Sequence, residues 1–590
     1  MRIKHFFGLA VIAAMTASCS SNNDLTNGGG NGSGENETGA SYASFSINLP
    51  TTSGTRADSD PTFDKGSDNE YKVNDATLLI FKKGETTKEG ETTKEGDYTF
   101  VESAELGSMA PWQKPNPDET GVTTHAKITA KLEHVDKNGD FFALVLLNNG
   151  TGTNTKVAVP TTEGMKFSVW NAAANATYDK FTKTDNGFYM ANAPLFDKDN
   201  TTNKVTTLVA IKKDNIYPTE EQAAKGTATD IYVERGLAKV TLKTGKVVTG
   251  KTDDNYTVTG VTYQGDQVKI SNWALDVTNK NTFPIHNVDG LSDDYTNIWS
   301  NTDTPAGSNG ATTQRFVDNK DTKAKRVYWG KDPNYDNKEA DKPALKAEFN
   351  YVANEGVTVE PSKPLYCLEN TFNLANMMQG QTTRVVFKAT YKPASLPEGE
   401  TTFYKIGKNT AIWREADLEK EIKAAVASVV TGATTDKITV DLKAKGNNIT
   451  AAGTHYITAD NITVTDVETE TIEKAITAIN TQLGLKESDK VGISTYAGGE
   501  SYYIARIKHF GDDLTKWESG LYGEKNLEYL GRYGVLRNNW YELTVQSVSG
   551  PGYPSVPEVK PNTPDDEDDK YISVSVKILD WAKRSQNVDL

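Results

Sequence analysis

Two segments in which apolar and polar residues alternate strictly lie at opposite ends of this chain, and each adjoins a polar stretch. The first runs from Tyr42 to Leu49 and places Ala43, Phe45 and Ile47 on the same side as Leu49. Side chains of a β-strand point alternately to opposite faces, so a period of two predicts a half-buried strand. The chain must therefore provide a sheet in which this isolated segment can find partners.

The segment that follows the first strand, residues 50–61, has no apolar periodicity and predicts an exposed loop. It contains one arginine, Arg56, which is accessible to proteases if the loop is exposed. Cutting the Arg56–Ala57 bond would release the first strand together with everything before it, and would leave an apolar groove in the remaining fold. Arg56 could also be an ordinary linker residue, and composition alone does not separate the two interpretations.

The second alternating segment runs from Tyr571 to Ile578, with Ile572, Val574 and Val576 on the same face as Ile578. Residues 551–570 before it contain five prolines and an acidic run at 565–569, which predicts an extended, solvated linker. Burying four such side chains contributes about 6–12 kcal/mol before any opposing terms. One strand could therefore hold two subunits together, or it could pair within its own domain as a last edge strand.

The first 18 residues predict a signal peptide, with a basic start and an apolar run at residues 6–15 that is too short to span a bilayer. The segment ends in Ala17-Ser18-Cys19, which resembles a bacterial lipobox with Cys19 as the acylated residue. Residues 19–41 then form a polar tether rich in Ser, Asn and Gly. Acyl chains on Cys19 would hold the precursor at a membrane. The alternative is an ordinary signal peptide with a cysteine near its cleavage site.

The composition favours β-rich domains and argues against nucleic acid as a partner. Thr, Asn, Gly, Val and Tyr are abundant in the 590 residues, and the formal charge of −15 repels phosphate backbones. We expect an N-terminal β-domain over residues 57–243 and a C-terminal β-domain over 244–550, with helices limited to stretches such as 416–430 and 472–485. Cys367 lies in an apolar run and is expected to be a buried hydrophobic residue.

The residues expected of an enzyme or a metal site are missing. The histidines beyond the leader have no ligand at metal-binding spacing, and they are His125, His134, His286, His455 and His509. No phosphate loop, dinucleotide fingerprint or nucleophile elbow is present, and the acidic stretch 332–339 lacks the central glycine of a calcium loop. We therefore expect a structural protein with no catalytic residues, no metal and no cofactor.

Several fragments, in order along the whole chain, resemble the fimbrillins of Bacteroidales, specifically the major subunit of short (minor) fimbriae, a type V pilin. They are residues 73–81, 141–149, 187–193, 233–240, 273–280, 366–371, 382–386, 536–543 and the terminal segment through 590. The resemblance implies a mainly β fold of two β-sandwich-like, transthyretin-like domains with a few short helices.

The resemblance also implies a mechanism of assembly. A precursor lipidated at Cys19 reaches the outer membrane, and an arginine-specific protease cuts between Arg56 and Ala57. The removable first strand, residues 43–49, is lost, and the donor strand of a neighbouring copy, residues 572–578, fills the vacated groove. Unclosed head-to-tail contacts of this kind build a filament. The partners implied are further copies of the chain and accessory or anchor subunits, in a surface fimbrium that supports adhesion and biofilm formation.

Two other functions remain open at this point. The chain could be an accessory or tip subunit, which needs an acceptor groove but need not donate a strand. It could also be a monomeric surface lipoprotein that binds glycans through exposed tryptophans, for which the candidates are Trp112, Trp170, Trp299 and Trp329.

Overall fold

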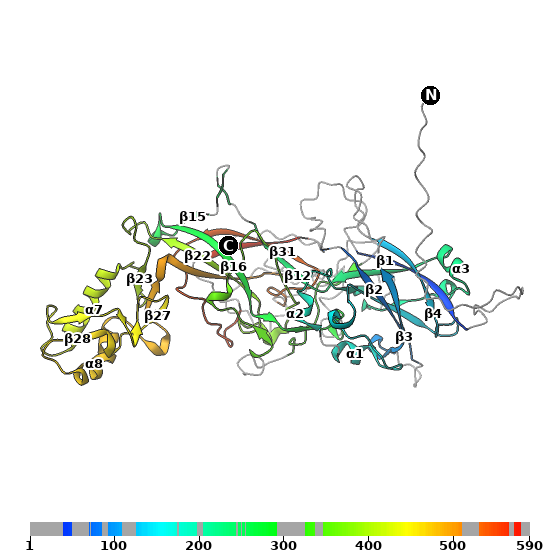
Figure 1. The fold of residues 1–590 in the computed structure, drawn as a ribbon, viewed down its shortest axis with the longest axis horizontal. Helices are drawn as coiled ribbons and strands as arrows, with labels where there is room; N and C mark the ends of the chain where they lie inside the picture. The colour runs from blue at the N-terminus through cyan, green and yellow to red at the C-terminus, as the bar shows by residue number, and fades with distance from the viewer. Residues whose placement is uncertain are drawn as a thin grey trace, which may run out of the picture.

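The computed structural model describes residues 39–49, 70, 72–84, 93–108, 125–173, 176–196, 205–243, 246–248, 251–253, 255–291, 325–336, 346–509, 530–565 and 572–579. The described part is elongated and mainly β, which confirms the predicted fold class (Figure 1). A large sheet lies at one end of the molecule, two smaller sheets lie in the middle, and a lobe that contains helices lies at the other end.

An eight-stranded sheet forms the N-terminal unit. In spatial order its strands are β3 (Thr99–Ser108), β2 (Asp75–Lys82), β5 (Phe141–Leu147), β7 (Met190–Asn192), β11 (Thr229–Arg235), β1 (Ser41–Asn48) and β4 (His125–Leu132), with β10 (Val209–Ala210) paired to β5. The two end strands, β3 and β4, come together because the backbone N–H groups of Glu133 and His134 donate to the Glu102 carboxylate at 2.9 and 3.0 Å. The sheet therefore curls around its own core.

Helices α1 (Phe167–Ala173) and α2 (Tyr178–Phe181) complete this core. Phe167 and Trp170 of α1 pack on Phe81 of β2, with ring centroids 5.5 and 6.4 Å from the Phe81 ring. The ring of Phe181 of α2 packs against the ring of Tyr189, with the two centroids 4.6 Å apart. Apolar residues of α1, α2 and the strands β1, β2, β3, β4, β5, β7 and β11 thus form one continuous cluster.

Two four-stranded sheets face each other in the middle of the molecule and bury a second core. One contains β21 (Leu365–Cys367), β12 (Ala238–Leu242), β31 (Trp540–Val548) and β32 (Ile572–Leu579), and the other contains β15 (Asn255–Thr257), β16 (Gln267–Asp276), β22 (Arg384–Lys392) and β30 (Glu500–Arg506). Val240 and Leu543 of the first sheet meet Val385 and Phe387 of the second in this core. Cys367 is also fully buried there, as predicted, and burial raises the pKa of its thiol to about 12.

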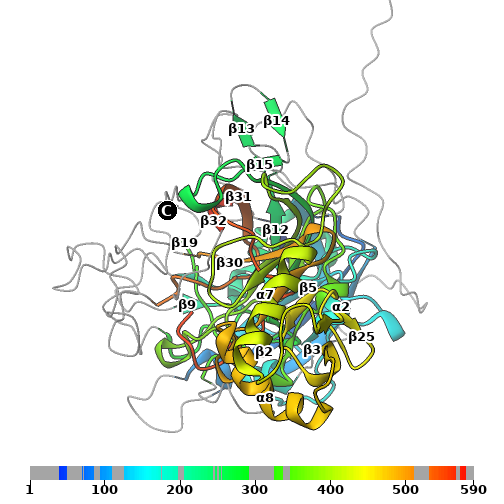
Figure 2. The ribbon, with the colours of Figure 1, turned by 90° about the vertical axis from the view of Figure 1, so that its left-hand side faces the viewer.

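A third cluster forms the distal lobe, which is inserted between β22 and β30. It contains α7 (Glu415–Val429), α8 (Thr469–Gln482) and a sheet of β23 (Phe403–Ile406), β29 (Ile493–Tyr496) and β27 (Gly453–His455). The period of 3.6 correctly predicted the buried face of α7, since Leu418, Ile422 and Val426 all point into the lobe. Figure 2 shows this lobe from its free end, with both helices toward the viewer.

The remaining strands form five short pairs and one three-stranded sheet. They are β6 (Ala176–Thr177) with β18 (Asn281–Thr282), β8 (Leu195–Phe196) with β9 (Val205–Thr206) and β19 (Lys325–Arg326), β13 (Lys246–Val248) with β14 (Lys251–Asp253), β17 (Thr278–Asn279) with β20 (Phe349–Asn350), β24 (Ile438–Val440) with β28 (Ile462–Val464), and β25 (Lys443–Ala444) with β26 (Asn447–Asn448).

The chain crosses from the first sheet to the second at Gly236 and Leu237, directly between β11 and β12. A Cβ atom on Gly236 would lie 2.7 Å from the ring of Phe181 and 2.9 Å from that of Tyr189, so a side chain at this position would displace the rings. The expected boundary after residue 243 falls just beyond β12. The crossing is therefore short and tightly packed.

Candidate functional site

Strand β1 lies inside the eight-stranded sheet, between β11 and β4. It runs parallel to β11, with Phe45 opposite Thr229 and Ile47 opposite Ile231. It runs antiparallel to β4 along its whole length, with Phe45 opposite Ile128. Both backbone edges of β1 are therefore hydrogen-bonded to neighbouring strands.

The alternating residues of this segment are buried as the sequence predicted. Ala43, Phe45 and Ile47 are 0% exposed and Leu49 is 3% exposed, and all four belong to the core of the first sheet. Phe45 is among the largest fully buried side chains in the described part of the chain. At about 1.5–3 kcal/mol for each large side chain, this strand contributes substantially to the N-terminal core.

The opposite face of β1 is covered by helix α3 (Glu220–Lys225), which the sequence did not suggest. Ser44 points to this face and is 0% exposed. Its Oγ donates to the carbonyl oxygen of Ala223 at 2.7 Å and lies 2.8 Å from the hydroxyl of Thr129 on β4. A small polar residue is needed here because the backbone of α3 lies directly above it.

Two further contacts hold α3 and the segment before it in place. Tyr42 exchanges two backbone hydrogen bonds with Tyr217, both at 2.8 Å. Lys127 of β4 donates from Nζ to the carbonyl oxygens of Ala224 and Gly226 at 2.8 and 3.0 Å. Carbonyl groups at the C-terminal end of a helix lack partners within the helix, so Ser44 and Lys127 both satisfy this end of α3.

Removal of β1 would therefore open a slot that has a definite shape. The backbone edges of β11 and β4 would lose their partners, the apolar floor would lose four side chains, and α3 would form the roof. Unpaired strand edges beside apolar surface are a site at which another strand can add. Cys19, Arg56 and Ala57 lie outside the described residues.

Glu70, which follows the predicted cleavage bond, is bound firmly to the middle of the molecule. Its carboxylate lies 2.7 Å from Nζ of Lys239 on β12, and the two side chains are 1% and 5% exposed. Tyr366 donates to the same carboxylate at 2.8 Å, and Arg235 donates to the Glu70 carbonyl at 2.6 Å. Lys239 also lies over the ring of Trp540, 3.5 Å from its centroid. The chain after the predicted cut is thus fixed at Glu70.

The C-terminal alternating segment forms β32, at the edge of the four-stranded sheet. It pairs antiparallel with β31 of the same chain, from Ile572 opposite Val548 to Leu579 opposite Trp540. The strand that carries Ile572, Val574, Val576 and Ile578 therefore does not lie beside β1 in this chain. In this structure both terminal strands are bound within their own subunit, in different sheets.

The linker before β32 differs from the sequence-based expectation over residues 551–565. This segment, which we call the strap, lies along the protein surface. Tyr553 exchanges two backbone hydrogen bonds at 2.8 Å with Tyr502 of β30. At its far end Asp565 is fully buried, with its carboxylate 2.7 Å from the Thr382 hydroxyl. The backbone of the strap thus finds partners in the protein, which its proline and acidic residues did not indicate.

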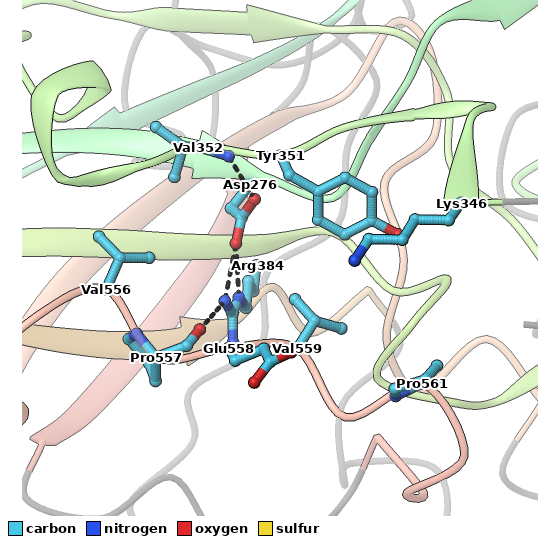
Figure 3. A pocket seen from close by; sticks show the side chains of 10 residues that line it. All are labelled: Asp276, Lys346, Tyr351, Val352, Arg384, Val556, Pro557, Glu558, Val559 and Pro561. Carbon is cyan, nitrogen blue, oxygen red and sulfur yellow. Dashed lines mark hydrogen bonds and ion pairs between the residues drawn. The ribbon is translucent and has the colours of Figure 1, made fainter. Parts of the chain in front are cut away.

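Arg384 fixes the middle of the strap (Figure 3). Its guanidinium forms a buried ion pair with Asp276 at 2.8 Å and donates to the carbonyl oxygen of Pro557 at 2.6 Å. A pocket of about 350 Å³ lies beside this contact, between the strap and residues 346–352. The Asp276–Arg384 pair at its base is already matched, so we treat the pocket as part of the strap's binding site.

The described residues give no support to a metal site or to exposed tryptophans. Within the described residues, no group of three His, Cys, Asp or Glu side chains could hold a metal ion, and no helix is long and apolar enough to cross a bilayer. Trp170 and Trp329 are buried in cores, so they cannot serve as exposed glycan-binding residues. Trp112 and Trp299 lie outside the described residues.

Three solved structures from Parabacteroides distasonis ATCC 8503 share some similarity with this chain. Two are named for cell adhesion, with 11% and 10% identity and TM-scores of 0.37 and 0.34; each alignment covers 92% of this chain, and 98% and 99% of the other chains. The third is a fimbrial assembly protein with 10% identity, a TM-score of 0.26, and coverage of 63% and 93%. With scores this low, we draw no argument from them.

The sequence matches no curated protein significantly. Residues 494–587, however, match the family described as "Major fimbrial subunit protein type IV, Fimbrillin, C-terminal". This region contains β30, β31, the strap and β32. Residues 494–587 are therefore similar to the C-terminal region of the fimbrillins, in agreement with the resemblance first drawn from the sequence.

Proposed function

We propose that this chain is the structural shaft subunit of a bacterial surface fimbrium and has no catalytic role. It is made as an outer-membrane lipoprotein precursor, acylated at Cys19 and activated by an arginine-specific protease that cuts the Arg56–Ala57 bond. The cut frees β1, and the C-terminal strand of a neighbouring copy then fills the slot. Repetition of this step builds a head-to-tail polymer, to which accessory and anchor subunits attach.

The observation that carries this proposal is the position of β1. It is a core strand, yet its covalent link to the rest of the described fold runs only through residues 50–69, which contain Arg56. Because β1 lies between two strands and over a core, its loss would expose the two edges of β11 and β4 and an apolar floor. Such a slot requires a replacement strand.

The second support is a strand of matching pattern at a sheet edge. Among the described residues, β32 pairs with β31 alone, so its departure breaks one ladder. A tip subunit would need the slot alone, whereas this chain has both a slot and an edge strand on a separate segment. The pair of features favours a shaft subunit over a tip subunit.

The test is to treat purified precursor with an arginine-specific protease and to follow size by gel electrophoresis and light scattering. We expect loss of residues 1–56, followed by ladders of multimers that survive mild denaturant. Arg56→Ala should remain uncut and monomeric, and deletion of residues 572–590 should permit the cut but abolish the ladders. A wild-type chain that is cut at Arg56 and stays monomeric under all conditions would overturn the shaft role.

Lipidation is tested separately with Cys19→Ser. We expect this variant to lose membrane association before cleavage, because acyl chains supply the anchor. Unchanged fractionation of the variant with the outer membrane would refute the role assigned to Cys19. Polymerisation of purified protein should not depend on Cys19, since this residue is removed by the cut.

A further inference from the structure

The two faces of β1 impose different demands on any strand that replaces it. On one face, Ala43, Phe45, Ile47 and Leu49 pack on the apolar floor, where the replacing residues must also be apolar. The roof is narrower, because Ser44 is 0% exposed beneath α3 and its hydroxyl contacts both Ala223 and Thr129. The position of Ser44 therefore requires a small residue, and a hydroxyl satisfies the Ala223 carbonyl.

We propose that the donor strand enters the slot in the same direction as β1, with Ser573 in the place of Ser44 beneath α3. This inference rests on the strand exchange proposed above and specifies its register and orientation. It assigns Ser573 as the donor residue whose small side chain fits beneath α3.

The sequences of the two strands support this register. When residues 571–578 are placed on residues 42–49 in the same direction, Tyr571 falls on Tyr42 and Ser573 falls on Ser44. Ser575 falls on Ser46, and the four apolar residues of the donor fall on the four buried positions of β1. Lys577 takes the position of Asn48, which is half-buried at the end of the strand and leaves a long side chain a route to solvent.

The alternative registers place unsuitable residues in buried positions. A shift by two residues in one direction puts Tyr571 beneath α3, and a shift in the other puts Asp580 at the position of Leu49. The reversed orientation with Ser575 beneath α3 puts Lys570 at that same buried position. The first of these registers is disfavoured because a tyrosine is too large for the space beneath α3. The other two are disfavoured because an unpaired charge in an apolar site costs several kcal/mol unless it is neutralised or reaches water.

The same-direction register also preserves both backbone ladders of the slot. The donor would run parallel to β11 and antiparallel to β4, as β1 does. Ser573 would then lie opposite Thr129, and Ser575 would lie opposite Lys127, since these are the partners of Ser44 and Ser46. In the reversed orientation Ser573 and Ser575 exchange these partners.

The first experiment compares Ser573→Leu with Ser575→Leu in the full precursor after arginine-specific cleavage. We expect Ser573→Leu to reduce multimers about tenfold or more, because the larger side chain meets the backbone of α3. Ser575→Leu is the matched control and should polymerise nearly as wild type, since Ser46 is only half-buried. Equal yields from the two variants, or a larger loss from Ser575→Leu, would overturn the register.

A second experiment does not depend on a bulky substitution. Two double variants carry Lys127→Cys, one with Ser575→Cys and the other with Ser573→Cys, and are polymerised under mild oxidation. The proposed register predicts disulfide-linked multimers for the Ser575→Cys pair, because directly opposite residues on paired strands are close enough to bridge. Preferential cross-linking of the Ser573→Cys pair would establish the reversed orientation and refute the proposal.

These outcomes separate the two proposals. If wild-type chains fail to form multimers after cleavage, strand exchange itself is wrong. If they form multimers but the serine and cysteine variants behave contrary to expectation, only the register is wrong. The thermal unfolding of each uncut variant shows whether its own fold is intact, because Ser573 and Ser575 also lie in β32 of the precursor.

Discussion

Replacing Phe45 by alanine tests whether β1 supports the precursor and is absent from the polymer. Phe45 is fully buried in the N-terminal core, and a Phe→Ala change in such a site costs about 3–5 kcal/mol. Because about 1.4 kcal/mol corresponds to a factor of ten, the opening equilibrium of the first sheet should rise roughly 100-fold to several thousand-fold. The effect should be confined to the uncut precursor.

Hydrogen exchange measured by mass spectrometry resolves this effect along the chain. Peptides from β4 and β11, the two neighbours of β1, should lose protection in Phe45→Ala, whereas peptides from α7 in the distal lobe should keep theirs. Ser46→Ala is the control on the same strand and should change stability by less than about 0.5 kcal/mol. If the Phe45→Ala chain is too unstable to purify, Phe45→Leu can replace it and should lower the free energy of unfolding by less than about 1.5 kcal/mol.

The polymer gives the opposite expectation. After cleavage at Arg56 the strand that carries Phe45 is lost, so multimers built from Phe45→Ala chains should resist heat and denaturant as well as wild-type multimers do. An equal loss of stability in precursor and polymer would show that β1 stays in place. Unchanged protection of β4 and β11 in the precursor would show that the burial of Phe45 contributes little.

Three further predictions follow from other contacts. Glu70→Gln leaves Lys239 buried without its carboxylate partner and should lower the free energy of unfolding by about 3–5 kcal/mol, measured by urea denaturation. The double variant Glu70→Gln/Lys239→Met should recover much of this loss. Burial raises the pKa of Asp332 to about 7, so the folded protein holds a proton that the unfolded chain loses near pH 4, and stability should fall as pH rises from about 4 to about 7. Asp332→Asn should reduce this dependence, measured as urea midpoints across that range, and the remainder should include the contribution of Glu95, whose pKa burial also raises to about 7. Thr219 is the N-cap of α3, and its hydroxyl accepts from the Gln222 N–H at 3.3 Å. Thr219→Ala should destabilise α3 by about 1 kcal/mol and so speed the release of residues 1–56 after cleavage about fivefold. Size-exclusion chromatography measures this release.

The terminal strands were predictable because their signal is local. An alternation over eight residues fixes which side chains share a face, and the four apolar residues that it places together are all buried, while Ser44 on the other face is buried as well. The neighbours of each strand were not predictable, since the pairing of β1 with β11 and β4 joins residues at least 77 positions apart along the chain. The cover of α3 over Ser44 is also a tertiary feature, because residue 44 and Ala223 are 179 positions apart along the chain.

The strap shows where composition misleads. Prolines and acidic residues indicate an extended, solvated linker. Residues 551–565 contain bends and turns. Their backbone is nevertheless bound, because Arg384 and Tyr502 present partners that lie far away in the sequence. Asp565 is buried for the same reason, since Thr382 offers a hydroxyl at 2.7 Å. No local pattern encodes these contacts.

The structure also explains why proteolysis can act as the switch in the proposed assembly. Before the cut, β1 is tethered to its slot, and a tether of this kind gives a strand an effective concentration of about millimolar, which a strand from another subunit cannot match at low concentration. The side chains of β1 and of the donor strand are similar, so replacing one strand by the other buries a similar set of apolar groups. The exchange by itself therefore changes the free energy little. After the cut, β1 is held by its contacts alone, and once it leaves it is diluted, while the donor strand stays attached to a subunit that is being incorporated. The direction of assembly then comes from the loss of a covalent link, and the buried serine beneath α3 limits the replacement to a strand of the right pattern.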